Sequence, residues 1–174
     1  MTRAIVVMGV AGSGKSTLGR ALAAALGWAF VEGDTLHPPA NIARMAAGVA
    51  LNDADRLPFL ENVARTIATR QGNLVITCSA LKRAYRDLLR RTEPQLLFVL
   101  PVLCREALQR RLQQRSDHFM PAALLDSQLA DLELPQADER IVQLDGSAPP
   151  DQQVAVTLAA LKGMMRSVGN LISS

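Results

Sequence analysis

The first 27 residues constrain the fold more than any other part of the chain. "AIVVM" at 4–8 is a short, apolar, β-branched run of the kind that forms a strand buried on both faces of a sheet. "GVAGSGKS" at 9–16 follows it directly and matches the phosphate-binding pattern G-x-x-x-x-G-K-[ST] in full. "STLGRALAAALG" at 16–27 then has the composition of a helix that ends at a glycine. A strand, a glycine-rich loop and a helix in this order predict a nucleoside triphosphate site.

The glycine-rich loop has a specific physical role for each kind of residue. Its glycines let backbone N–H groups turn toward phosphate oxygens, and the helix N-terminus adds partial positive charge. Lys15 is expected to reach the β- and γ-phosphates, and the Ser16 hydroxyl is expected to ligate Mg²⁺. The alternative, an accidental glycine-rich turn, is disfavoured by the strand and helix on either side. We expect ATP to be bound by Gly9, Val10, Ala11, Gly12, Ser13, Gly14, Lys15, Ser16 and Thr17.

Four further apolar runs, at 29–34, 73–78, 95–100 and 140–145, alternate with helical segments. This alternation predicts an α/β fold with three layers, in which helices cover both faces of a five-stranded parallel sheet. The 174 residues contain no repeat or flexible linker, so we expect one domain over 1–174. Ligands of such a fold gather at the carboxyl ends of the strands.

Charge and cysteine content narrow the partners. The 19 basic and 16 acidic residues form no run of like charge, so nucleic acid is not an expected partner. No apolar stretch is long enough to span a membrane, and we expect no membrane partner. The two cysteines, Cys78 and Cys104, lack the spacing of a disulfide framework or a zinc site. These features fit a cytoplasmic protein.

Two acids follow the second expected strand. If 29–34 is extended, Glu32 and Asp34 face the same side at the edge that carries the phosphate loop. One acid can then approach Mg²⁺ through water while the other orients an acceptor hydroxyl. We assign the second role to Asp34 and the first to Glu32. The alternatives, a helix cap or an ion pair with an arginine, stay open for both.

His37 and Asn41 lie just beyond these acids, in "DTLHPPAN". Both side chains can hydrogen-bond a polyhydroxylated acceptor. A histidine before two prolines can equally fix a turn, so the residues alone leave both roles open.

Six segments in fixed order resemble the gluconate kinase (gluconokinase) family of phosphate-loop kinases from residue 8 to about 139. They are "GVAGSGKST", "EGDTLHPPANIARM", "LNDADRLPFL", "CSALKRAYRDLLR", "RLQQRSDHFMP" and "DSQLADLELPQADE". The resemblance implies a fold similar to nucleoside monophosphate and shikimate kinases. It also implies ATP-dependent phosphorylation of D-gluconate at its 6-hydroxyl. The chain departs from the family at Arg44, where lysine is frequent, and at Phe59, where tryptophan is common.

Further acceptor-binding residues are expected under this resemblance. Arg56 would clamp a sugar-acid carboxylate, although an ion pair with Asp53 or Asp55 is an open alternative. Ser79 and Lys82 follow the strand at 73–78 and can reach the shared sheet edge, and Gln128 is also expected to contact the acceptor.

The arginine-rich segment "RRLQQRSDHF" is similar to the lid of small kinases, which we place at about 112–122. Arg111 is expected to stack on adenine, and Arg115 to meet the transferring phosphate when the lid excludes water. His118 can contact phosphate or order the lid. Enzymes similar to this one are often homodimers, which is the assembly we expect. The remaining alternatives are a kinase for another small acceptor and a non-catalytic nucleotide- or RNA-binding module.

Overall fold

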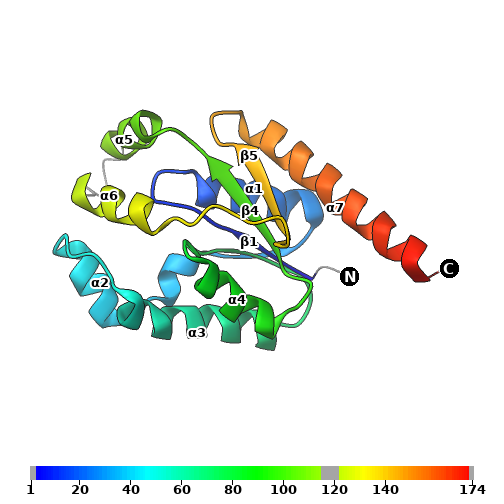
Figure 1. Cartoon of the computed structure of the whole chain (residues 1–174), viewed down its shortest axis with the longest axis horizontal. Coiled ribbons are helices and arrows are strands. Elements are labelled where there is room, and N and C mark those ends of the chain that lie inside the picture. Colours follow the sequence, from blue (N-terminus) through cyan, green and yellow to red (C-terminus); the bar gives the residue numbers. More distant parts are fainter. Residues whose placement is uncertain (1–2, 115–121, 173–174) are drawn as a thin grey trace.

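The computed structural model describes residues 3–114 and 122–172, and in these residues five parallel strands form one sheet in the order β2-β3-β1-β4-β5 (Figure 1). The strands are β1 (Ala4–Val7), β2 (Ala29–Val31), β3 (Leu74–Thr77), β4 (Leu97–Val102) and β5 (Ile141–Asp145). The predicted α/β fold with a parallel sheet is confirmed. β1 lies at the centre, between β3 and β4, so the loop that follows it emerges in the middle of the sheet edge.

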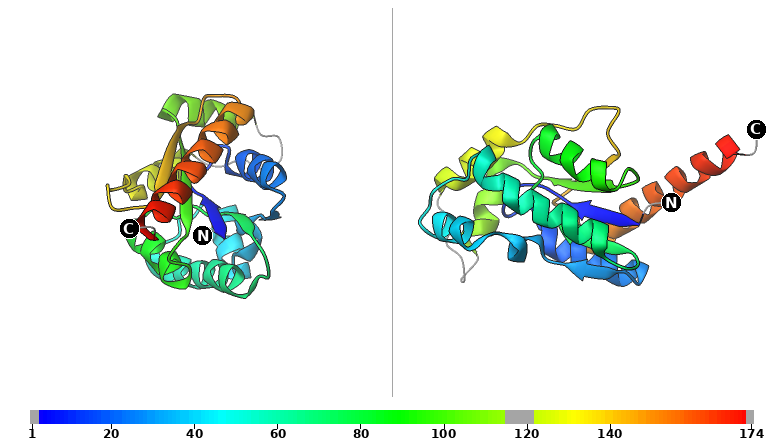
Figure 2. Two further views of the ribbon diagram at one scale, coloured as in Figure 1. Left: turned by 90° about the vertical axis from the view of Figure 1, so that its right-hand side faces the viewer. Right: turned by 90° about the horizontal axis from the view of Figure 1, so that it is seen from below.

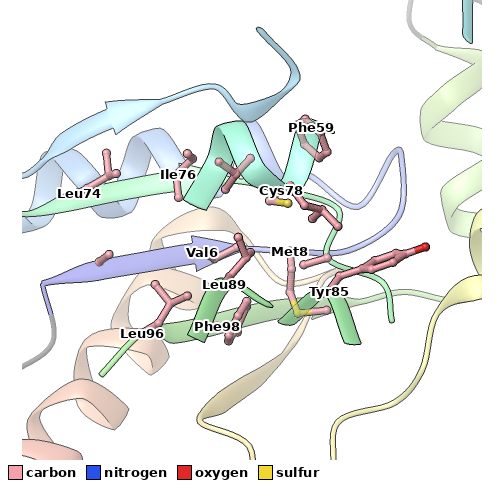
Figure 3. Close-up of a cluster of buried hydrophobic side chains, with 14 of the residues drawn as sticks. Val6, Met8, Phe59, Leu74, Ile76, Cys78, Tyr85, Leu89, Leu96 and Phe98 are labelled. Atoms are coloured by element: carbon pink, nitrogen blue, oxygen red, sulfur yellow. The ribbon is translucent and has the colours of Figure 1, made fainter. Parts of the chain in front are cut away.

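Helices cover both faces of the sheet because its strands are apolar on both sides. Ile5 and Val7 of β1 face α1 (Lys15–Leu26) and α7 (Pro150–Ile172). Val6 and Met8 face the other way, toward α3 (Asp53–Thr69) and α4 (Arg83–Thr92). Figure 3 shows this second cluster, which Phe59, Tyr85 and Leu89 complete.

The remaining helices gather at the carboxyl edge of the sheet (Figures 1 and 2). They are the 3₁₀ turn η1 (Gly33–Leu36), α2 (Pro39–Ala46), α5 (Arg105–Gln113) and α6 (Ala122–Asp131). Leu108 and Leu112 of α5 and Leu125 of α6 form a small third core with Val10 and Leu81, which belong to loops at that edge. These residues therefore form a separate apolar cluster beneath the loops at the carboxyl edge of the sheet.

Sequence signals account for the ends of several helices. Gly27 adopts a left-handed conformation and caps α1, and its N–H group donates to the carbonyl groups of Ala23 and Ala24. Asn52 caps α3 in a capping box with Asp55, in which each side chain accepts a hydrogen bond from the other residue's backbone.

A buried ion pair joins α4 to the segment before β5. The guanidinium of Arg86 is fully buried and donates two hydrogen bonds to Glu139, at 2.6 and 2.9 Å. Its third nitrogen donates to the carbonyl groups of Leu81 and Glu133. Because every one of these acceptors lies in a loop, Arg86 fixes backbone that no helix or strand holds.

Candidate active site

The phosphate loop (Gly9–Ser16) has the backbone geometry that its glycines predict. Gly9, Gly12 and Gly14 have φ angles of +131°, +81° and +90°, which other residues rarely adopt. Gly14 is also the N-cap of α1, so the helix begins at Lys15 and directs its first free N–H groups into the loop. A Cβ at Gly12 would lie 3.0 Å from Leu112, so α5 packs directly against the loop.

Neighbouring elements hold the phosphate loop in place. The N–H group of Gly9 donates to the carbonyl oxygen of Ser79 at 3.1 Å, which ties the loop after β1 to the loop after β3. The ammonium group of Lys15 donates to the carbonyl oxygen of Val10 at 2.9 Å. The cation therefore curls over its own loop, where a phosphate chain would lie.

Arg111 connects the phosphate loop to the loop after β5. Its guanidinium donates to the carbonyl oxygen of Gly146 at 2.8 Å and to that of Ser13 at 3.4 Å. The structure thus places Arg111 beside the phosphate loop, and its contact with adenine stays a prediction. Arg115 and His118 lie outside the described residues, as does most of the expected lid.

The acids after β2 are arranged differently from the expectation. The strand ends at Val31, and Gly33 begins a 3₁₀ turn, so Asp34 does not continue an extended strand on the side of Glu32. The cause is close packing: the N–H group of Gly33 donates to the Thr77 hydroxyl at 2.8 Å, and a Cβ at Gly33 would lie 1.7 Å from the Thr77 carbonyl oxygen. Only glycine fits there, and the chain turns away from the sheet.

The two acids consequently differ in their surroundings. The Glu32 carboxylate accepts a hydrogen bond from the Thr77 hydroxyl and lies 3.6 Å from the guanidinium of Arg20. Asp34 is exposed, and within the described part of the chain no group forms a hydrogen bond or an ion pair with its carboxylate. Of the two, Asp34 is the acid whose oxygens are available to a ligand.

Asp34 and Lys15 both act electrostatically on Cys78. This thiol is buried at the carboxyl end of β3, and burial raises its pKa to about 12. Burial is the main cause of this shift; the Asp34 carboxylate also raises the pKa of Cys78, and the Lys15 ammonium group lowers it. The expected proton acceptor and the expected phosphate ligand therefore both lie within electrostatic range of this thiol.

His37 and Asn41 lie together on the acceptor side. The imidazole of His37 stacks on Phe59, with ring centroids 3.7 Å apart and planes 8° from parallel. Burial lowers the pKa of His37 below its usual 6.5; Asp34 opposes this effect and Arg56 adds to it. The amide group of buried Asn41 donates to the Asp55 carbonyl oxygen at 2.7 Å, and its nitrogen lies 3.5 Å from His37 Nδ1.

Arg56 is the most buried cation of the acceptor side, with 7% of its surface exposed. Its Nη1 donates to Asp131 at 2.6 Å and to the Tyr85 hydroxyl at 3.4 Å. Burial lowers the pKa of Arg56, but these two hydrogen bonds outweigh it, so the pKa is raised overall. The partner is therefore Asp131, and neither Asp53 nor Asp55 as the sequence suggested.

Lys82 lies beside Arg56. Its ammonium group contacts Asp53 at 2.7 Å and Asp131 at 3.5 Å, and the hydrogen bond to Asp53 raises its pKa. Both cations lie over the Tyr85 ring, each 5.8 Å from the centroid. Figure 3 shows the Tyr85 hydroxyl pointing out of the apolar cluster, where it donates to Asp53.

A cavity of about 580 Å³ opens next to these charges. Its lining joins the loop before α3 to α6 and includes Asp53, Lys82, Ser127 and Asp131. This volume exceeds that of a six-carbon chain, and its wall carries charged groups and the Ser127 hydroxyl group.

The chain matches known proteins over most of its length. Residues 5–135 match a family model described as an AAA domain. A gluconokinase from Gluconobacter oxydans is 48% identical over 152 residues, which cover 86% of this chain and 85% of that protein. The thermosensitive gluconokinase of Escherichia coli is 44% identical, with 80% and 77% covered.

The chain belongs to the gluconokinase family. The crystal structure of a gluconokinase from Sinorhizobium meliloti superposes with a TM-score of 0.89 at 44% identity, over 97% of this chain and 96% of that one. Shikimate kinase from Aquifex aeolicus, at 19% identity and a TM-score of 0.59, shares the fold. The resemblance seen in the six sequence segments is confirmed.

This member of the gluconokinase family contains site residues that the sequence did not single out. Asp131 and Tyr85 contact Arg56, and Asp53 contacts Lys82. Gln128 accepts a hydrogen bond from the Ala11 N–H group of the phosphate loop at 2.7 Å, and its expected contact with the acceptor stays a prediction. "DSQLADLELPQADE" carried a family signal, but nothing in it distinguished which polar side chain faces which half of the site.

No helix within residues 3–114 and 122–172 of this gluconokinase-family chain is long and apolar enough to cross a membrane. Nor do residues 3–114 and 122–172 contain a cluster of three or more histidine, cysteine or acidic residues suited to a metal ion.

Proposed function

We propose that the protein transfers the γ-phosphoryl group of ATP to the 6-hydroxyl of D-gluconate, giving 6-phosphogluconate and ADP. Membership of the gluconokinase family supports this reaction. The structural observation that carries it is the meeting of three parts at one sheet edge: a phosphate loop, the exposed acid Asp34 and the cation pair Arg56 and Lys82.

The nucleotide half uses mainly backbone. The N–H groups at the start of α1 and in the phosphate loop would bind phosphate oxygens, and Lys15 would leave the Val10 carbonyl group to bridge the β- and γ-phosphates. The Ser16 hydroxyl, in the first turn of α1, would ligate Mg²⁺, which neutralises charge on the phosphates when bound. Glu32 would contact that ion only through water, since Thr77 and Arg20 engage its carboxylate.

Asp34 would act on the acceptor hydroxyl. The hydroxyl oxygen forms a bond to the γ-phosphorus while the bond from that phosphorus to the ADP oxygen breaks. The transition state is loose, so Asp34 mainly orients the hydroxyl and accepts its proton late. Arg111 adds positive charge beside the loop, and Arg115 is proposed to meet the transferring phosphate.

The acceptor half would bind the gluconate chain at both ends. Arg56 and Lys82 supply positive charge for the carboxylate, with Ser79 at the adjoining strand end. His37 and Asn41 lie between Arg56 and Asp34 in the chain and would hydrogen-bond hydroxyl groups. Gln128 is better placed to steady the phosphate loop than to touch the acceptor directly.

The test is ADP release by the purified protein with Mg²⁺–ATP and a panel of acceptors: D-gluconate, other aldonic acids, shikimate, AMP and RNA. We expect stimulation by D-gluconate and recovery of 6-phosphogluconate. Replacement of Asp34 by Asn should lower kcat about 10²- to 10⁴-fold and leave ATP binding unchanged, because the nucleotide half is intact.

Glu61→Gln is the matched control, since Glu61 is an exposed acid on α3 outside the site. Turnover of Asp34→Asn at the wild-type rate would rule out the role of Asp34. A different preferred acceptor would rule out gluconate and leave the nucleotide half standing. The homodimer and the cytoplasmic location remain predictions.

A further inference from the structure

Helix α6 contacts both halves of the site through two side chains three residues apart. Gln128 accepts a hydrogen bond from the Ala11 N–H group of the phosphate loop. Asp131, on the same face and one turn further on, contacts Arg56 and Lys82 of the acceptor half. The two contacts fix α6 across the edge where the substrates would meet.

The Asp131 carboxylate bridges two cations. Its Oδ2 lies 2.6 Å from Arg56 Nη1, and its Oδ1 lies 3.5 Å from Lys82 Nζ. The centroid of the Tyr85 ring lies 5.8 Å from each of the two cations. Arg56, Lys82 and Tyr85 thus form an anion site, and the anion bound in it belongs to the protein itself.

Charge balance shows what a second carboxylate would meet there. Asp53 and Asp131 together compensate the charges of Lys82 and Arg56. The carboxylate of an acceptor would add a third negative charge to a half-buried cluster that is already neutral, which is unfavourable. One of the two aspartates therefore has to give up its contact.

Asp131, and not Asp53, occupies the position on Arg56 that an acceptor carboxylate would take. Asp53 contacts Lys82 and Tyr85 but makes no hydrogen bond to Arg56, and its side chain is 66% exposed. Asp131 holds the buried cation and is 24% exposed, and it lines the adjacent cavity from α6. Its side chain can turn into this cavity when another carboxylate takes its place on Arg56.

We propose that Asp131 is an internal competitor for the acceptor carboxylate: it occupies the anion site of Arg56 and Lys82, and the acceptor binds by displacing it. This inference rests on the proposed function, because it takes an acceptor with a carboxylate. Asp131 keeps the buried Arg56 paired while no acceptor is bound, and it lowers the affinity for the acceptor. It takes no part in the chemical step.

The test is the KM for D-gluconate of Asp131→Asn, which keeps the size and a hydrogen-bond acceptor but removes the charge. We expect this KM to fall about fivefold, since the competing charge is gone, with the KM for ATP unchanged. The dissociation constant of D-gluconate, measured by calorimetry without ATP, should fall by the same factor. Asp126→Asn is the matched control: Asp126 is an acid on the same helix, paired with exposed Arg105, and its loss should leave the KM unchanged.

The direction of the change in the KM for D-gluconate distinguishes a competing Asp131 from an aligning one. A higher KM for D-gluconate in Asp131→Asn would overturn the proposal, because it would mean that Asp131 aligns Arg56 for the acceptor instead of competing with it. An unchanged KM would overturn it too. If Asp131→Asn fails to fold, as judged by thermal melting, Asp131→Ser takes its place with the same expectation. Wild-type protein that neither binds nor phosphorylates D-gluconate would refute the proposed function, and the inference with it.

Discussion

The nucleotide half and the acceptor half of the site are built in different ways. The phosphate loop is one continuous segment whose shape comes from glycine backbone and from the start of α1. The acceptor half is assembled from side chains of α3, α4 and α6, and its central contact joins Arg56 to Asp131, 75 residues apart. A local motif is thus sufficient for one half, whereas the other exists only after the chain has folded.

This contrast predicts that damage to the nucleotide half stays in the chemistry, whereas damage to the acceptor half also changes packing. The ammonium group of Lys15 contacts a carbonyl group of its own loop, but Arg56 is buried in a network with Tyr85 and Asp131.

Replacement of Lys15 by Met should lower kcat about 10²- to 10³-fold, because the positive charge on the transferring phosphate is lost. The melting temperature should stay within about 2 °C of wild type, since the Val10 carbonyl oxygen that Lys15 contacts also accepts a hydrogen bond from the Ser13 N–H group. Steady-state kinetics and thermal melting measure the two effects. A large loss of stability would show that the nucleotide half is not the self-contained unit described above.

Replacement of Arg56 by Lys should raise the KM for D-gluconate about tenfold or more, because lysine cannot reproduce the planar fork of the guanidinium. The KM for ATP should not change. Lysine also leaves the Tyr85 and Asp131 contacts imperfect, and we expect about 1–2 kcal/mol of lost stability. Arg44→Lys provides the control, since the guanidinium of exposed Arg44 forms an ion pair with Asp55, at 3.4 Å. Equal effects of both variants on KM would argue against an acceptor role for Arg56.

The smallest effect concerns pH. Because burial against Phe59 lowers the pKa of His37, the unfolded chain binds a proton there more readily than the folded one. His37 therefore contributes full stability above pH 6.5, the usual value, and the contribution is lost as pH falls below it. Between pH 7.5 and 5.5, the melting temperature of His37→Phe should fall about 1–3 °C less than that of wild type. An equal change of melting temperature with pH in the two proteins would contradict a lowered pKa of His37.

The sequence predicted those features that depend on local pattern. β1, the phosphate loop and the Gly27 cap of α1 follow from periodicity and glycine placement, and the order of strands and helices followed from the apolar runs. The expected extended path to Asp34 was wrong because the Gly33 N–H group and the Thr77 hydroxyl, 44 residues apart, form a contact that no local pattern encodes. Asp131 was missed for the same reason: its partner is set by how α6 packs.

The buried pair of Arg86 and Glu139 has a consequence for how this sequence can change over evolutionary time. Loss of Glu139 alone would leave the Arg86 charge in the interior without its carboxylate, at a cost of about 3–5 kcal/mol. Loss of Arg86 would leave Glu139 with the more distant Arg90, at 3.7 Å, as its ion-pair partner, whereas replacement of both Arg86 and Glu139 by apolar residues can be nearly neutral. The two positions are separated by 53 residues, yet a lineage can leave this state only by changing them nearly together. Related chains should therefore retain both or lack both, and this covariation would identify the contact without a structure.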